Sequence, residues 1–337
     1  MKINQLMPHR LILATLLLAG LSACTGTSTS TPQFENTYTA ENRYAQDVKS
    51  FPNIQGIAST AVPAEVIEYK NLTYVRYGAR TLQLDLYMPK ALANQPASSL
   101  TPAVVLVHCG GWQSGYRTHL TPMAIELAKA GYVAATITYR LSPEARYPAA
   151  VQDVKAALRW LRSNASQYHV DPNRIAVGGS SAGGQIASLT GMTNGFAHFD
   201  PQAAQSQVSS DAQLILNIDG LSDFTSAEAR KFEDVPGRSA AARWFGGSYA
   251  EKRDLWHQAS PTYYVGESSP PILFLNSSQA RFHVGRDEMT AKMQIYGIPY
   301  KVVTLADTPH TFWLYEPWIK PAAAEVVAFL QEHFGRE

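Results

Sequence analysis

Two patterns of hydrophobic and polar positions recur along the chain from residue 66 onward. Apolar and polar side chains alternate in Leu72–Tyr77 and Leu82–Met88, which is typical of strands with one buried face, and Gly78 lies in the turn between them. Ala103–His108 is a continuous apolar run, as expected of a strand covered on both faces. Further strands are predicted at 132–139, 174–179, 214–218, 271–276 and 300–305.

Helical spacing of apolar residues fills most of the intervals between these strands. It predicts helices at 122–130, at 149–163, from residue 182 and at 321–334. Strand and helix in alternation favour right-handed crossovers and a mostly parallel central sheet with helices on both faces, which is an α/β fold. We expect the stretches 196–211 and 224–265 to be irregular insertions over a site at the carboxyl ends of the strands.

The beginning of the chain is typical of an export signal. Positive charge precedes the apolar run Leu11–Gly20, which is too short to span a membrane. Leu21–Cys24 resembles the lipobox of bacterial lipoproteins, which implies removal of residues 1–23 and attachment of lipid such as palmitate to Cys24. Because Thr25 rather than Asp follows the cysteine, we expect an anchor in the bacterial cell envelope, at the outer membrane. The alternative is an ordinary secretory signal with a chance cysteine.

Small residues follow the lipobox in Thr25–Pro32, and such a tract is typical of a flexible tether. We expect residues 24–63 to form the lipidated cysteine and its tether, and residues 64–337 to form the globular domain. The chain has only 2 cysteines, Cys24 and Cys109. If lipid occupies Cys24, no intramolecular disulfide can form.

Composition excludes several classes of function. Hydrophobic residues make up 45% of the 337 residues and charged residues 16%, as in an ordinary globular protein. The balance of 28 basic and 27 acidic side chains gives a formal charge of +1, which disfavours nucleic-acid binding. Histidines are scattered and neither H-E-x-x-H nor C-x-x-C occurs, so we expect no metal and no cofactor. Nothing in the sequence indicates the oligomeric state.

Gly179–Gly183 reads G-S-S-A-G and fits the pattern G-x-S-x-G. A predicted strand runs directly into it and a predicted helix follows, which is the context of a nucleophile elbow. This register makes Ser181, not Ser180, the candidate nucleophile. The N-terminus of the following helix would favour the negative charge that develops during acyl transfer. The alternative is an ordinary turn of small residues.

His108–Trp112 follows the strand 103–108 and resembles the H-G-G-G motif of the hormone-sensitive-lipase-like branch of α/β-hydrolases. The resemblance implies that Gly110, Gly111 and Ala182 donate backbone N–H groups to an oxyanion. Cys109 replaces the first glycine, and it would be strained by about 1 kcal/mol or more if that position needs a positive φ. The segment Tyr139–Glu144 resembles the same branch.

The resemblance also implies that Arg140 and Asp153 form a structural pair at the base of the site.

The candidate base is His310, in the loop between the last strand and the last helix. This position keeps the order in which serine comes first and histidine last. His310 would take the proton of Ser181 and return it to the leaving alcohol.

The acidic member of a catalytic triad is ambiguous in this sequence. Related enzymes carry an Asp shortly after the next-to-last strand, but Gln279 or Ala280 occupies that place here. Asp219 follows the preceding strand and could reach the histidine from the neighbouring strand end. Asp287 would serve if the loop bulges, although a carboxylate in the first turn of a helix is also explained by capping. We favour Asp219 narrowly, and Asp223 is a third candidate.

The combined motifs are similar to those of α/β-hydrolase serine esterases over residues 66–334. Arg243–Gly247 and Ala259–Pro261 resemble the lid segment of bacterial feruloyl and acetyl xylan esterases, the BD-FAE-like group. The resemblance implies hydrolysis of acetyl or feruloyl esters on plant cell-wall polysaccharide such as xylan or pectin, through an acyl-enzyme. Display at the cell surface would suit polymers that cannot enter the cell.

Four residues are candidates for substrate binding. Trp112 and other tryptophans could offer a platform for a sugar ring. Arg281, His283 and Arg286 crowd the loop at the mouth of the predicted site, and one or both arginines could bind a uronate carboxylate. The alternative is that the arginines pair with nearby acidic residues. Two other functions remain open, namely a serine peptidase of the prolyl-oligopeptidase type and a non-catalytic binding lipoprotein of the same fold.

Overall fold

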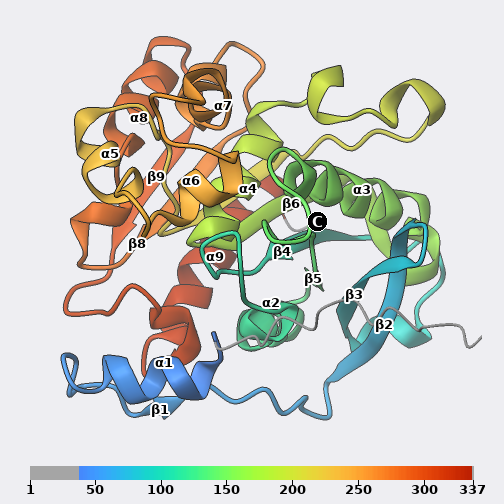
Figure 1. Cartoon of the computed structure of the whole chain (residues 1–337). Helices are drawn as coiled ribbons and strands as arrows, with labels where there is room; N and C mark the ends of the chain where they lie inside the picture. The colour runs from blue at the N-terminus through green and yellow to red at the C-terminus, as the bar shows by residue number, and fades with distance from the viewer. Residues whose placement is uncertain (1–37, 336–337) are drawn as a thin grey trace, which may run out of the picture. The chain divides into compact units, whose positions relative to one another are not determined.

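The computed structural model describes residues 38–335 (Figure 1). The predicted signal, the lipidation site Cys24 and the first part of the expected tether lie outside these residues. Among the described residues, no helix is both long enough and apolar enough to cross a membrane.

An eight-stranded sheet forms the centre of the fold. Its strands, in chain order, are β2 Val66–Tyr77, β3 Arg80–Pro89, β4 Thr101–Val107, β5 Val133–Ile137, β6 Val170–Ser180, β7 Leu214–Ile218, β8 Ile272–Asn276 and β9 Tyr300–Thr304. Each contains or overlaps a strand predicted from the hydrophobic pattern.

The strands lie in the order β2-β3-β5-β4-β6-β7-β8-β9. β2 and β3 pair antiparallel, as do β3 and β5, and all other pairs are parallel. The parallel part brings the carboxyl ends of β4, β6, β7 and β8 to one edge of the sheet. This is the mostly parallel α/β-hydrolase architecture that the sequence predicts.

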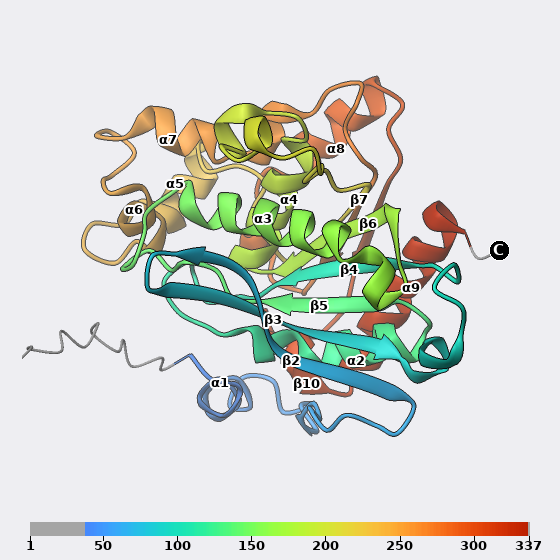
Figure 2. The same ribbon diagram turned by 90° about the vertical axis from the view of Figure 1, so that its right-hand side faces the viewer.

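Alternate side chains of the central strands enter two separate cores. On β4, Val105 and Val107 pack into the core beneath α3 (Ala149–Ser163), while Val104 and Leu106 pack into the opposite core. The first core also takes side chains of α4 (Ala182–Met192) and α8 (Arg286–Ile295). Figure 2 shows α3 along this face of the sheet.

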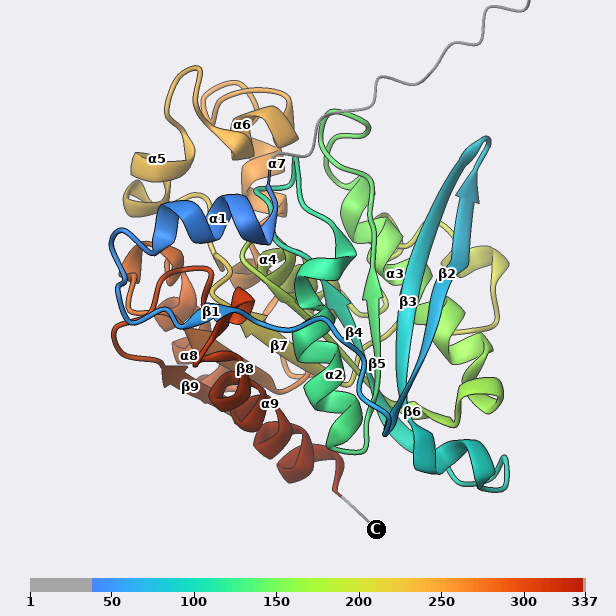
Figure 3. The same cartoon turned by 90° about the horizontal axis from the view of Figure 1, so that it is seen from below.

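The opposite face is covered by α2 (Thr121–Lys129) and α9 (Ile319–Phe334), which Figure 3 shows together with α1. Helix α4 consists mainly of small and apolar residues and is buried along its whole length. It has no polar face because it lies between the sheet and the later helices. Both faces of the sheet are therefore buried, as its continuous apolar strands require.

The expectation of a tether as far as residue 63 is wrong. Helix α1 (Ala40–Asp47) begins after the N-cap Thr39, and strand β1 (Gly56–Ile57) pairs with β10 (Tyr315–Glu316). Side chains of α1 and the following turn pack on the second core. The folded part therefore starts before residue 40, because contacts with the far end of the chain order a segment that has little apolar pattern of its own.

The stretch 224–265 is also more regular than expected. It contains three short helices, α5 (Ala227–Glu233), α6 (Ala240–Phe245) and α7 (Arg253–Gln258). Figure 2 shows them beyond the arrowheads of β4 and β5. The serines that precede α5 and α6 accept hydrogen bonds from the first turn of each helix. Helices of six or seven residues are too short to reveal a helical period in the sequence.

Candidate active site

Ser181 occupies a sharp turn between β6 and α4. Its backbone is held at φ 54° and ψ −121°, a conformation that residues other than glycine rarely adopt. A Cβ on Gly179 would lie 2.4 Å from the carbonyl oxygen of Gly183, and one on Gly183 would lie 2.0 Å from that of Val107. The two glycines of the motif are therefore required by the close approach of the turn to itself and to β4.

The loop after β9 brings His310 to this serine. His310 Nε2 lies 2.8 Å from Ser181 Oγ, and His310 Nδ1 lies 2.7 Å from Asp219 Oδ2. The ring of Phe282 stacks on the imidazole with 3.3 Å between centroids, and Trp313 meets it edge-on. The packing of Phe282 and Trp313 against the imidazole thus holds it between the hydroxyl of Ser181 and the carboxylate of Asp219.

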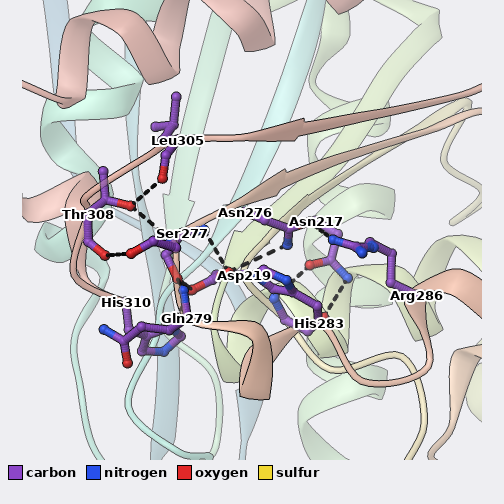
Figure 4. A network of polar contacts seen from close by, with 12 residues as sticks. Asn217, Asp219, Asn276, Ser277, Gln279, His283, Arg286, Leu305, Thr308 and His310 are labelled. Atoms are coloured by element: carbon purple, nitrogen blue, oxygen red, sulfur yellow. Dashed lines mark hydrogen bonds and ion pairs between the residues drawn. The ribbon is translucent and has the colours of Figure 1, made fainter.

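Asp219 follows β7 and is completely buried. Its carboxylate accepts hydrogen bonds from the backbone N–H of Ser277 at 2.9 Å and from the Ser277 hydroxyl at 2.6 Å. His283 Nε2 lies 3.2 Å from the same carboxylate, at Oδ1 (Figure 4). The loop after β8, where the family resemblance led us to look for the acid, here provides groups that hold Asp219 at the end of the neighbouring strand.

The local environment sets the charges of this pair. Burial raises the pKa of Asp219, but the hydrogen bonds from His283, His310 and Ser277 outweigh it and bring the pKa down to about 2. Burial lowers the pKa of His310, and the charges of Arg281 and Arg43 lower it further, against the opposing effect of Asp219. At neutral pH the arrangement therefore holds an ionised Asp219 beside a neutral imidazole, as a general base requires.

The structure does not bring Asp287 to the histidine. The side chain of Asp287 is 81% exposed on the first turn of α8, and it pairs with Arg286 at 2.8 Å. Asp287 as the third member of the triad is therefore wrong, because Asp287 lies in the first turn of α8 with its side chain in solvent. Asp223 instead accepts hydrogen bonds from the backbone of Thr225 and Ser226 in the turn that leads to α5.

The loop after β4 presents unpaired backbone donors beside Ser181. Gly110 has φ 127° and Gly111 has φ 57°, and a Cβ on Gly110 would lie 2.0 Å from the carbonyl oxygen of Ser114. Neither glycine donates its N–H to another described residue. Ala182 is the first residue of α4, where a helix has no internal acceptor for its N–H. The three groups are available to a negatively charged oxygen.

Cys109 fits its position without strain. It is not among the described residues with positive φ, so the first glycine of the related motif is not required here. Its side chain is fully buried, with Sγ 3.8 Å from His119 Nδ1. Burial raises the pKa of the thiol to about 11, so Cys109 stays protonated and does not act as a nucleophile.

A pocket of about 430 Å³ lies above Ser181. Its walls come from α1 and the turn after it, from the loop after β4 and from the loop after β8. The lining residues are Tyr38, Arg43, Asp47, Ser50, Phe51, Gly110, Gly111, Ser181, Gln279, Arg281, Phe282 and His310. The five from the first 51 residues were not predicted from the sequence. The N-cap Thr39 and the acidic Glu41 in the first turn are local signals for α1, the helix that carries two of the five.

The tryptophans do not form a sugar platform. Trp112 is 5% exposed and stacks on Trp244 at 5.2 Å, and its Nε1 donates to Gln185. Trp112 as a substrate-binding residue is therefore wrong, because its indole packs in the core beneath the insertions. The other tryptophans considered for this role are also buried: Trp244, Trp256, Trp313 and Trp318.

Of the three basic residues predicted at the mouth of the site, only Arg281 lines the pocket. Arg286 is occupied elsewhere, because it bonds to Asp287 at 2.8 Å and to Asn276 Oδ1 at 2.9 Å (Figure 4). His283 points to Asp219 rather than to the pocket. Direct substrate contact by Arg286 and His283 is thus not supported by their positions.

Two further features surround the site. Arg140 forms a bidentate pair with the fully buried Asp153, which also accepts a hydrogen bond from Tyr77, so the pair joins the segment after β5 to α3 and β2. Among the described residues, no group of three or more His, Cys, Asp or Glu side chains is arranged to hold a metal ion.

The chain resembles solved esterase structures. A truncated carbohydrate esterase from gut microbiota superposes with a TM-score of 0.67 at 21% identity, over 84% of this chain and all (100%) of that one. Esterase B from Lactobacillus rhamnosis gives a TM-score of 0.64 at 21% identity, over 87% of this chain and 94% of that one. These likenesses show the α/β-hydrolase fold.

Curated proteins named as esterases resemble the chain at higher sequence identity. Esterase LipC of Mycobacterium tuberculosis is 30% identical over 242 residues, which is 67% of this chain and 57% of that protein. Esterase LipQ of the same organism is 28% identical over 205 residues, 60% of this chain and 47% of that protein. The chain thus spans about half the length of these relatives. The BD-FAE family model matches residues 84–282, more than half of the chain, and the chain belongs to the BD-FAE family.

Proposed function

We propose that the protein is a serine carboxylic-ester hydrolase that removes acyl groups from carbohydrate. The observation that carries the proposal is the continuous relay from Ser181 Oγ through the His310 imidazole to Asp219, with separations of 2.8 Å and 2.7 Å. The hydroxyl at its end opens into a pocket beside Gly110 and Gly111. This combination of nucleophile, base, acid and backbone donors fits acyl transfer.

The reaction follows from the positions of these groups. As Ser181 Oγ attacks the ester carbonyl carbon, its proton passes to His310 Nε2, while Asp219 holds Nδ1–H and stabilises the imidazolium. The oxygen of the tetrahedral intermediate accepts hydrogen bonds from Gly110, Gly111 and Ala182. The C–O bond to the alcohol then breaks, and His310 returns the proton to the leaving oxygen. In the second half, His310 Nε2 takes a proton from a water molecule, whose oxygen attacks the acyl carbon. The bond between that carbon and Ser181 Oγ then breaks, His310 returns the proton to Ser181 Oγ, and the carboxylic acid is released.

The proposed substrate is an acetyl or feruloyl ester on a plant cell-wall polysaccharide such as xylan or pectin. Membership of the BD-FAE family supports this class, and a superposable structure is itself named a carbohydrate esterase. The pocket supports it too, because Ser50 and Gln279 bring side chains that can hydrogen-bond to sugar hydroxyls. We further propose that lipid on Cys24 holds the enzyme at the cell envelope, close to such polymers.

Two alternatives are less well supported. A serine peptidase would use the same relay, but the curated relatives are named esterases. A non-catalytic lipoprotein would not need a nucleophile at φ 54° next to a base with a buried carboxylate behind it. Both alternatives remain outcomes of the experiment below.

The test compares Ser181→Ala with Ser180→Ala, which removes the adjacent hydroxyl buried at the end of β6. With p-nitrophenyl acetate and acetylated xylan, Ser181→Ala should lower kcat by about 10⁶-fold, and Ser180→Ala should retain activity. A fluorophosphonate should label the wild type and not Ser181→Ala. Turnover of a peptide amide in preference to the esters would support the peptidase, and absence of both labelling and turnover would support the binding protein.

A further inference from the structure

Arg281 stands out among the charged residues of the pocket because none of residues 38–335 accepts a hydrogen bond from its guanidinium. It lies in the single 3-10 turn Ala280–Phe282 that follows β8. No hydrogen bond or ion pair joins its guanidinium to another described residue. An arginine offers five N–H donors in a planar fork, so a guanidinium at the edge of a site without an acceptor is available to a ligand.

Two aromatic rings nevertheless hold the guanidinium in place. Its central carbon lies 4.4 Å from the centroid of Phe282 and 5.3 Å from that of Phe232. Phe282 itself stacks on His310, so the cation is placed one ring away from the catalytic imidazole. Contacts of this kind fix the orientation of a guanidinium without consuming its N–H groups. They also reduce the entropy that arginine would lose on binding a ligand.

The other charges of the pocket largely cancel. Arg43 of α1 donates to Asp47 Oδ1 at 2.5 Å and to Gln46 at 2.9 Å, so its charge has a partner within the same helix. Among the lining residues this leaves Arg281 as the cation without a counter-charge. Glu233 interacts electrostatically with Arg281, but it forms no ion pair within 4.0 Å, and burial raises the pKa of its carboxyl.

We propose that Arg281 binds a carboxylate of the substrate, so that the preferred ester belongs to an acidic saccharide, with a uronate close to the acylated hydroxyl. The inference rests on the proposed esterase function and specifies its substrate. A carboxylate matches the arginine fork with two parallel N–H···O bonds, which a neutral sugar cannot do. The acyl chain could also carry the carboxylate, and the experiment separates these two sources.

The experiment compares kcat/KM for matched pairs of esters. The first pair is an acetylated glucuronate-bearing xylo-oligosaccharide and its neutral acetylated counterpart, and the second is p-nitrophenyl hemisuccinate and p-nitrophenyl butyrate. We expect the wild type to favour the uronate ester by about tenfold, as for a charge-assisted hydrogen-bonded pair, with no preference in the second pair. A preference for the hemisuccinate alone would overturn the assignment to a uronate.

Three variants test whether Arg281 causes the preference for the uronate ester. Arg281→Gln should reduce the charged-to-neutral ratio to about one, and Arg281→Lys should retain part of it, because lysine keeps the charge without the fork. Arg253→Gln is the matched control, since Arg253 is exposed on α7 and also lies over an aromatic ring. Its ratio should equal that of the wild type. An unchanged ratio in Arg281→Gln would overturn the inference.

A binding measurement separates this inference from the esterase proposal. Calorimetry on Ser181→Ala, with the unacylated uronate-bearing and neutral xylo-oligosaccharides as probes, needs no turnover. Tighter binding of the uronate probe that disappears in Ser181→Ala/Arg281→Gln supports the inference even if no ester is hydrolysed. Equal or absent binding of the two probes by Ser181→Ala overturns it even if neutral esters are good substrates.

Discussion

The carboxylate of Asp219 lies 2.7 Å from the Nδ1 atom of His310, although 91 residues separate the two in the sequence. The contact joins the end of β7 to the loop after β9 across the end of β8, which lies between these two strands in the sheet. The acid of the triad therefore follows β7 and not β8. The loop after β8 still contributes to the triad, because its residues Ser277 and His283 contact the carboxylate of Asp219.

The first prediction concerns the identity of the acid. Asp219→Asn should lower kcat by about 10⁴-fold, because an amide cannot stabilise the imidazolium and favours the wrong tautomer of His310. Asp287→Asn should retain the wild-type rate, because its side chain is 81% exposed and bonded to Arg286. Initial rates with p-nitrophenyl acetate measure both. A large loss in Asp287→Asn with little loss in Asp219→Asn would reverse the assignment.

His283 should act as a positioning residue for Asp219. Its Nε2 atom lies 3.2 Å from Asp219 Oδ1, on the side away from His310. His283→Leu should lower kcat about tenfold with little change in KM, because the carboxylate loses a polar partner and its orientation. The acid limb of the pH profile should also move upward, because a less well stabilised carboxylate attracts the protonated form of His310 more strongly.

Two further variants test whether the effect of His283→Leu comes from the lost contact with Asp219. His283→Gln, which can still donate to the carboxylate, should recover part of the loss. His198→Gln changes an exposed histidine outside the site and should leave rate and profile as in the wild type. A fall in folded yield with an unshifted pH profile would assign His283 a structural role only.

The pH dependence of kcat/KM should reflect the environment of His310. Burial and the charges of Arg281 and Arg43 lower its pKa from the ordinary 6.5, so the acid limb should have its midpoint below that value. Activity is lost as pH falls through this midpoint, because the protonated imidazole cannot accept the proton of Ser181. Arg281→Gln removes a positive charge and should move the midpoint upward. A midpoint above 6.5 in the wild type would contradict this account.

Much of the fold was predictable because its signals are local. The buried strand β4 is almost entirely apolar, and β6 ends in a short apolar segment that leads into the glycines. The glycines around Ser181 are required by close backbone contacts at the turn. The position of His310 followed from the order of strands and helices. These features depend on short segments whose conformation is encoded in their own composition.

The acid was less predictable because two adjacent parallel strands, β7 and β8, end beside the same histidine. Asp219 directly follows β7, whereas Asp287 comes after the loop that follows β8, and the local sequence does not indicate which carboxylate faces His310. The choice is made by donors on the β8 loop, chiefly Ser277. Helix α1 was missed for a similar reason, since the contact of Asp47 with Thr311 spans 264 residues.

The last prediction tests whether α1 supports the active site. Asp47 at the end of α1 accepts hydrogen bonds from the hydroxyl of Thr311, the residue after His310, and from Tyr315 at 2.9 Å. Asp47→Ala should therefore lower the free energy of unfolding by about 2–3 kcal/mol, because it leaves these buried donors and Arg43 without their partner. It should also reduce kcat, since the loop that carries His310 loses its attachment to α1. Urea unfolding and ester kinetics measure the two effects. Glu41→Gln, an exposed change in the first turn of the same helix, is the control and should alter neither. Wild-type kcat in a destabilised Asp47→Ala would show that α1 contributes to the fold and not to the position of the base.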